Sequence, residues 1–225
     1  LLSLQMKKIG EVYRYLWLRN WFKFPLLISR DLLSKIRRLP PISTKKVIFP
    51  SSISSGEHSF SLISSSEDFI SLSSKSNGQI NNSQYLSFAR NSAFLQWRFF
   101  TKPGYYLYHS DFGYFVVNIF NWKNLNLLTI VDLQTDISNL GVTRAMIAAA
   151  KELAKKNRCD GIITLSSNVM LDKVLKKSLF VSVGSPFDIY TNIDIPFSEE
   201  QIQRRETNYI TMADSDLEFS FWPKA

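Results

Sequence analysis

The segment from residue 128 to residue 165 constrains the fold of this chain more than any other. It reads LTIVDLQTDISNLGVTRAMIAAAKELAKKNRCDGIITL: an apolar run, a polar turn with one glycine, an alanine-rich stretch and a second apolar run. Apolar residues in the alanine-rich stretch step by four, three and four positions, which is one helix face: Val142, Met146, Ala149 and Leu153. The segment therefore predicts a strand, a loop, a helix over 139–157 and a strand at 159–165. The turn at 137–143 either holds an anionic cofactor at the helix N-terminus or only reverses the chain.

Shorter patterns on both sides of this unit predict further strands and helices. Two strands at 105–109 and 114–120, joined by an Asp and Gly turn, form a predicted hairpin. The mostly apolar run 125–133 predicts a central strand. Other predicted strands are 57–63, 179–183, 187–193 and 209–212, and predicted helices lie near 66–72, at 92–100 and at 168–177. The strands at 179–183 and 187–193 are expected to pair with each other. The order predicts an α/β (α+β) domain with one parallel crossover in a mostly antiparallel sheet.

Charge is concentrated at the N-terminal end of the chain. The whole sequence carries +8, and residues 1–46 hold eleven Lys or Arg and two acids, which is 11 − 2 = +9. The other 179 residues therefore sum to 8 − 9 = −1, so the basic balance does not predict that the domain binds nucleic acid.

Cysteine and histidine are scarce. One cysteine, Cys159, excludes an internal disulfide framework, and two distant histidines, His58 and His109, do not predict a zinc site. The first ten residues lack the apolar core and cleavage site of a signal peptide, and the expected location is the cytoplasm. Position 1 is not methionine, which leaves open whether the sequence is a fragment.

The basic segment at 11–39 is aromatic in its first part and helical in its spacing from 25 to 39. It has two interpretations. Lys and Arg beside Trp and Phe suit a surface helix on anionic lipid, so residues 12–38 are a candidate for peripheral membrane contact. The alternative is a strand and a helix that pack on a protein core and turn a basic face to solvent.

Three segments resemble the GNAT superfamily of acyl-CoA N-acyltransferases, and in particular the C-terminal half of tandem GNAT-like proteins from bacterial surface-polysaccharide gene clusters. SAFLQWRFFTKPGYYLY carries the W-R-F triplet followed by Pro103 and an aromatic strand. NYITMADSD resembles the closing segment of those proteins, and MKKIGEVYRYLWL resembles the last strand of a preceding half. The resemblance implies a GNAT-like mixed sheet with helices on both faces at 56–197, a basic segment at 1–50 and a C-terminal tail at 198–225.

The resemblance also implies where acetyl-CoA or another acyl-CoA would bind as co-substrate. In the family, backbone N–H groups of a Q/R-x-x-G-x-G/A turn face the pyrophosphate, which suits the N-terminus of a helix. The aligned turn here departs from that pattern, because Ser138 replaces Gln or Arg and Thr143 replaces the last Gly or Ala. Only the first glycine, Gly141, matches. Capping of the helix by Ser138 or Asp136, with no ligand, is the alternative. The implied cofactor-binding residues are Leu133, Thr135, Asn139, Leu140, Gly141, Val142 and Thr143.

The catalytic residues that the resemblance implies are incomplete. Many family members protonate the leaving thiolate with a tyrosine in a Y-x-x-x-G-F pattern, and this chain has Leu175, Leu179 and Phe180 at the tyrosine, glycine and phenylalanine positions. Asp132 is a candidate base for the acceptor amine, although a carboxylate near a strand end is more often a turn or cap residue.

Arg98, Asp214 and Asp216 are the candidate substrate-binding residues. Arg98 can recognise a phosphate or carboxylate of the acceptor, or it can pair with Asp214 or Asp216 to fix the tail. The two aspartates are two positions apart, so in a strand they share one face.

Two functions follow from these patterns. The first is transfer of an acyl group to a small-molecule amine, such as an amino sugar, in surface-polysaccharide assembly, with no metal. The second is a binding or structural role for a catalytically degenerate GNAT-like half that supports a preceding half. The acceptor and the acyl group are not identified by the sequence.

Overall fold

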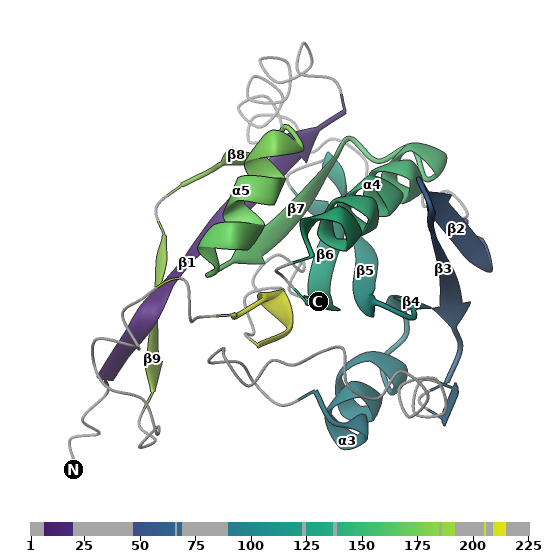
Figure 1. The fold of residues 1–225 in the computed structure, drawn as a ribbon, viewed down its shortest axis with the longest axis horizontal. Coiled ribbons are helices and arrows are strands. Elements are labelled where there is room, and N and C mark those ends of the chain that lie inside the picture. Colours follow the sequence, from purple (N-terminus) through teal and green to yellow (C-terminus); the bar gives the residue numbers. More distant parts are fainter. Residues whose placement is uncertain are drawn as a thin grey trace, which may run out of the picture.

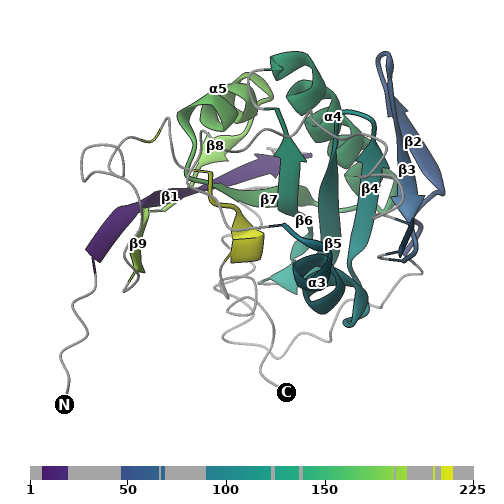
Figure 2. The same ribbon diagram turned by 60° about the horizontal axis from the view of Figure 1, so that its bottom comes forward.

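The computed structural model describes residues 7–19, 47–65, 67–68, 90–122, 125–136, 139–184, 186–191, 205 and 209–214. These residues form one nine-stranded sheet with helices packed on it (Figures 1 and 2). The strands are β1 (Lys7–Leu18), β2 (Ser52–Ser55), β3 (His58–Ile63), β4 (Tyr106–Ser110), β5 (Gly113–Trp122), β6 (Leu125–Thr135), β7 (Gly161–Ser166), β8 (Val181–Ser182) and β9 (Phe187–Thr191). The helices are α3 (Ser92–Leu95), the π-helical turn η3 (Gln96–Phe100), α4 (Leu140–Lys156), α5 (Val169–Lys177) and the 3₁₀ turn η4 (Met212–Asp214).

The unit of strand, helix and strand at 128–165 is confirmed. β6 and β7 pair in parallel from Leu127 with Gly161 to Ile130 with Thr164, and α4 connects them. The four residues of its predicted inner face are all buried. Every residue of β6 except Asn126 is buried, as expected for a central strand covered on both sides.

The sheet is mixed and mostly antiparallel, in the order β2-β3-β4-β5-β6-β7-β1-β8, with β9 paired to β1. Helices lie on both sides of it. On β5, Phe115 and Val117 pack in the cluster that contains α4 and α5, whereas Tyr114 and Val116 pack with Leu95 and Phe99 of α3 and η3. Because neighbouring residues of a strand point to opposite faces, α4 and α5 cover one face, and α3 with η3 packs on the other.

The first strand of the chain lies inside the sheet and not at its edge. β1 pairs antiparallel with β7 from Tyr13 with Ser166 to Leu18 with Gly161, and with β8 and β9 on its other side. Five of its apolar side chains are buried: Val12, Tyr15, Leu16, Trp17 and Leu18. This part of the basic segment is therefore a core strand, in agreement with the packing interpretation for residues 12–18.

The position of β1 corrects one prediction. The segments 179–183 and 187–193 were expected to pair with each other, but the described parts of both, β8 and β9, pair with β1 instead. β1 has 12 residues, so its two halves can provide separate backbone partners for β8 and for β9.

Other predictions fare differently. The strand predicted at 209–212 is wrong, because 209–211 is irregular and η4 begins at Met212. The predicted strand at 57–63 is confirmed as β3, and its partner β2 was missed. The predicted helix at 25–39, most of the one at 66–72, and the residues Ser138 and Asp216 lie outside the described residues.

Candidate functional site

The candidate site lies where β6 and β7 separate. Their pairing ends at Ile130 and Thr164, yet β6 continues to Thr135 and β7 to Ser166. Val131 is an extra residue in β6, since Val116 faces Asp132 and Val117 faces Ile130. Such a bulge bends a strand and increases its twist, which helps β6 to turn away from β7.

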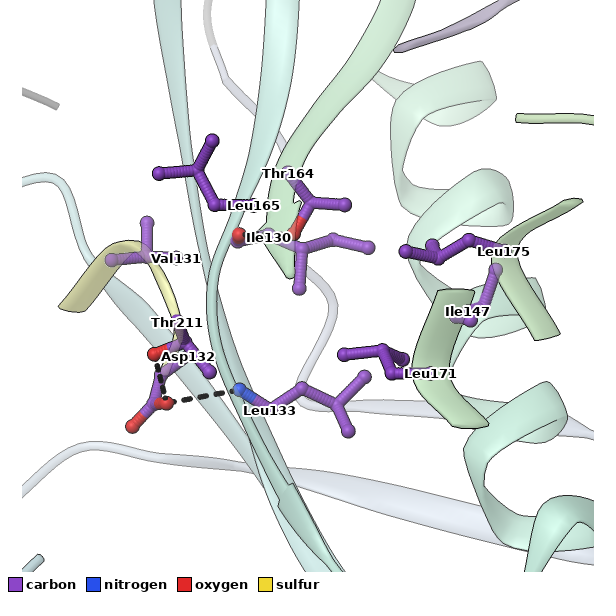
Figure 3. Close-up of a pocket in the computed structure, with 10 residues that line it drawn as sticks. All are labelled: Ile130, Val131, Asp132, Leu133, Ile147, Thr164, Leu165, Leu171, Leu175 and Thr211. Carbon is purple, nitrogen blue, oxygen red and sulfur yellow. Dashed lines mark hydrogen bonds between the residues drawn. The ribbon is translucent and has the colours of Figure 1, made fainter. Parts of the chain in front are cut away.

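A small cleft occupies this separation (Figure 3). Residues from both strands and from α4, α5 and the C-terminal segment line it: Ile130, Val131, Asp132, Leu133, Ile147, Thr164, Leu165, Leu171, Leu175 and Thr211. Its cavity volume is about 10 Å³, roughly the space of one water molecule. Leu171 and Leu175 give the α5 side an apolar wall.

We call residues 209–214 the C-terminal strap. The Tyr209 hydroxyl donates to the carbonyl oxygen of Leu133, and the Ile210 N–H donates to the Ser167 Oγ at 2.7 Å. Tyr209 packs in the α4 and α5 cluster, whereas Ile210, Met212 and Ala213 pack in the cluster on the opposite face. The strap therefore reaches both faces of the sheet at the point where β6 and β7 separate.

A buried cluster of charges holds the strap. Arg90 Nε lies 2.8 Å from Asp132 Oδ2, and Arg90 Nη1 lies 2.5 Å from Asp214 Oδ1. The side chain of Arg90 is 8% exposed and both carboxylates are fully buried. Thr211 Oγ1 donates to Asp132 Oδ1 at 2.8 Å, and its backbone N–H donates to Asp214 Oδ2 at 2.8 Å. One guanidinium thus joins β6 to the strap.

The cluster shifts the pKa of several members. Burial lowers the pKa of Arg90, but Asp132 and Asp214 outweigh that effect and raise it. Burial raises the pKa of Asp214, and Arg90 opposes that shift. Tyr114 donates its hydroxyl to Asp132 Oδ2 at 3.1 Å, and burial followed by the nearby Asp132 charge raises its pKa well above 10.

The sequence led us to expect Asp132 near the end of a strand, and the structure places it elsewhere. It lies within β6, and its carboxylate accepts hydrogen bonds from Arg90, Tyr114, Gln134 and Thr211. It also accepts the backbone N–H of Leu133 at 3.1 Å. These donors hold the carboxylate in place, and a role for Asp132 as a base stays a prediction.

The predicted cofactor turn is a capped helix start. The Asn139 side chain accepts the N–H of Val142 at 3.3 Å, so one of the unpaired amides of the first turn of α4 has a partner. Thr143 is fully buried and its hydroxyl donates to the Asn139 carbonyl. Gly141 is exposed. The capping residue is thus Asn139, and the amides of Leu140 and Gly141 belong to the same first turn. Thr135 donates its hydroxyl to the Phe112 carbonyl at 2.8 Å.

The structure pairs Asp214 with Arg90, a residue that the sequence analysis did not single out. Arg90 is followed by the helix cap Asn91, and its partners lie 42 and 124 positions along the chain, so no local pattern marks it. Arg98 is buried in η3, with its guanidinium carbon 5.8 Å from the centre of the Trp97 ring. A substrate-binding role for Arg98 stays a prediction.

Two further observations concern ligands and membranes. Among the described residues, no group of three or more His, Cys, Asp or Glu side chains is placed to hold a metal ion. No helix within the described ranges is long and apolar enough to cross a bilayer. In comparisons with protein-family models and with curated proteins, no match to this sequence was found.

Proposed function

We propose that this chain is a GNAT-like N-acyltransferase that transfers an acyl group from acetyl-CoA or another acyl-CoA to an amine such as an amino sugar. The observation that carries the proposal is the separation of β6 and β7 after Ile130 and Thr164. At the separation the N–H of Leu133 bonds to a side chain, and its C=O accepts the Tyr209 hydroxyl. Backbone groups without a strand partner are available to an extended amide-containing ligand.

The reaction itself needs few side chains. The amine nitrogen attacks the thioester carbonyl carbon, the C–S bond breaks, the sulfur leaves as a thiolate and takes a proton, and the amine nitrogen loses one. The Leu133 N–H donates to the Asp132 carboxylate in this structure, and it would stabilise the carbonyl oxygen after it exchanges Asp132 for that oxygen. The N-terminus of α4 would face the pyrophosphate through the amides of Leu140 and Gly141.

A second candidate function is that of a catalytically inactive half with a binding or structural role. It is favoured by the contents of the cleft. Leu175 provides no acid for the thiolate, Thr211 lines the cleft, and the remaining volume is about that of one water. In this case the fold would serve to present its surface to another half.

Calorimetric titration with acetyl-CoA decides between the two functions. The first predicts a measurable heat of binding and release of free thiol when an amino sugar is added. Gly141→Pro should weaken binding, since proline removes one first-turn N–H and a helix tolerates it there. Gly141→Ala is the matched control, because it keeps the N–H and adds a methyl group 3.3 Å from the Asn139 side-chain oxygen. Absence of binding at millimolar acetyl-CoA would exclude the donor site and leave the second candidate.

A further inference from the structure

The C-terminal strap lies in the space that a ligand of β6 would need. The Tyr209 hydroxyl takes the Leu133 carbonyl, and Thr211 lines the cleft and bonds to Asp132. The Ile210 N–H reaches across to Ser167, which follows β7. The strap thus bonds to both diverging segments and closes the opening between them.

Side-chain hydrogen bonds and an ion pair hold the described residues of the strap. At its end, Asp214 pairs with Arg90. Upstream of it, Arg205 pairs with Asp172 of α5, donates to the Ser167 carbonyl at 3.3 Å, and lies over the Tyr13 ring at 4.2 Å. Segments held by side-chain contacts at two ends can open locally at lower cost than strands of a sheet.

From this geometry we propose that the strap is an internal competitor for the acyl-donor cleft, which must swing out before an acyl-CoA can pair with β6 at Leu133. The proposal rests on the donor site proposed above and adds its regulation. The Leu133 carbonyl exchanges the Tyr209 hydroxyl for an amide N–H of the ligand. The free energy of donor binding is therefore the intrinsic free energy of ligand binding less the cost of opening the strap.

Two conservative variants test the competition in the full chain, with acetyl-CoA as the probe. Tyr209→Phe removes the hydroxyl that bonds to Leu133 and keeps the ring. Thr211→Val removes the hydroxyl that bonds to Asp132 and keeps the side-chain volume. Each should make acetyl-CoA bind roughly two- to tenfold tighter, which corresponds to the net contribution of one hydrogen bond to a closed state.

Tyr108→Phe is the matched control. The Tyr108 hydroxyl also donates to a backbone carbonyl, that of Pro50 at 2.8 Å, and its ring is buried in the same cluster. This variant loses an equivalent bond away from the cleft, so its affinity for acetyl-CoA should equal that of the wild type. An equal gain in Tyr108→Phe would overturn the proposal, because the effect would then reflect general loosening of the core.

Hydrogen exchange provides a second readout. The amide of Ile210 donates to Ser167, which lies outside the strap, and it should exchange faster when acetyl-CoA is bound. If the wild type binds acetyl-CoA while this amide stays protected and both strap variants bind with unchanged affinity, the strap is not a competitor and the donor site stands. If neither the wild type nor the strap variants bind acetyl-CoA at millimolar concentration, the donor site fails and the proposal fails with it.

Discussion

Arg90 joins β6 to the strap through two buried ion pairs. It is a single cation between two buried carboxylates, Asp132 on β6 and Asp214 on the strap. A buried charge is tolerated when it is paired and hydrogen-bonded, and removing one partner leaves the other charged in a medium that solvates it poorly. The three side chains therefore act as a unit.

Replacement of Arg90 should be strongly destabilising. We expect Arg90→Met to lower the free energy of unfolding by about 3–5 kcal/mol, because two carboxylates are left buried without their cation. Urea denaturation measures the change. Lys155→Met is the comparison, since Lys155 forms an exposed pair with Glu152 at 2.7 Å, and its loss should cost about 0–1 kcal/mol. Equal losses in the two variants would show that the Arg90 cluster is not a buried ionic unit.

Leu179 is a residue in a strained conformation. Its φ is +63°, in the left-handed region that favours glycine. It follows Ser178, the C-cap of α5, and the residue is 70% exposed. Glycine is the usual residue at this position because it has no Cβ to crowd the carbonyl oxygen.

Leu179→Gly should therefore stabilise the protein. The left-handed conformation costs leucine about 1–2 kcal/mol. Glycine avoids this cost but has more conformational entropy in the unfolded chain, which offsets part of the gain. The free energy of unfolding should therefore rise by about 0.5–1 kcal/mol. Thermal denaturation at matched pH measures it. Leu179→Ala keeps the Cβ and so keeps the strain, and its stability should stay near that of the wild type. A gain in Leu179→Ala equal to that in Leu179→Gly would assign the effect to loss of the exposed side chain.

At the scale of elements, the separation of β6 from β7 and the insertion of β1 next to β7 set up the site. The parallel pairing covers only Leu127 to Ile130 of β6. On its other side β7 pairs with β1 along its whole length, and this pairing holds β7 in place where β6 leaves it. Close backbone approach at the start of this pairing depends on Gly161.

Gly161→Ala tests the contact between β1 and β7. A Cβ at residue 161 would lie 2.3 Å from the backbone oxygen of Trp17, so one strand must move. We expect a loss of about 1–3 kcal/mol in unfolding free energy, typical of overpacking in a core, and a lower midpoint in urea. Gly56→Ala is a useful comparison, because a Cβ at residue 56 meets no atom within 4 Å, and only its φ of +60° opposes the change. An unchanged midpoint in Gly161→Ala would mean that β1 does not pack here as described.

At the scale of the whole molecule, segments from both ends of the described chain complete the centre of the sheet. β1 lies between β7 and the short strands β8 and β9, and the strap lies across the ends of β6 and β7 (Figure 1). The site is thus built from parts separated by more than a hundred positions, such as Arg90 and Asp214, which meet beside Asp132. Contacts between residues so distant in sequence carry a cost in loop-closure entropy. They are therefore stable only when the rest of the core is folded.

The sequence by itself determined the elements whose signal is local. α4 was predicted from its four-residue and three-residue steps and from the polar residues before it, and the hairpin of β4 and β5 was predicted from its Asp and Gly turn. The parallel crossover followed because a helix between two apolar runs returns the chain in the same direction. In each case the residues that decide the structure lie within about one helix length of one another.

The tertiary structure alone decided which extended segments pair and which charges meet. The sequence allows β8 and β9 to pair with each other, but both pair with β1. Backbone hydrogen bonds are the same for every residue type, so the sequence of a strand does not specify its partner. The partner depends on which other segments pack nearby. The pairing of Arg90 with Asp132 and Asp214 also depends on the tertiary structure. A buried cation needs carboxylates close in space, and these can come from any position in the sequence. Residues 209–212, predicted as a strand, are irregular up to the start of η4, and side-chain hydrogen bonds to Leu133, Ser167 and Asp132 hold them where β6 and β7 separate.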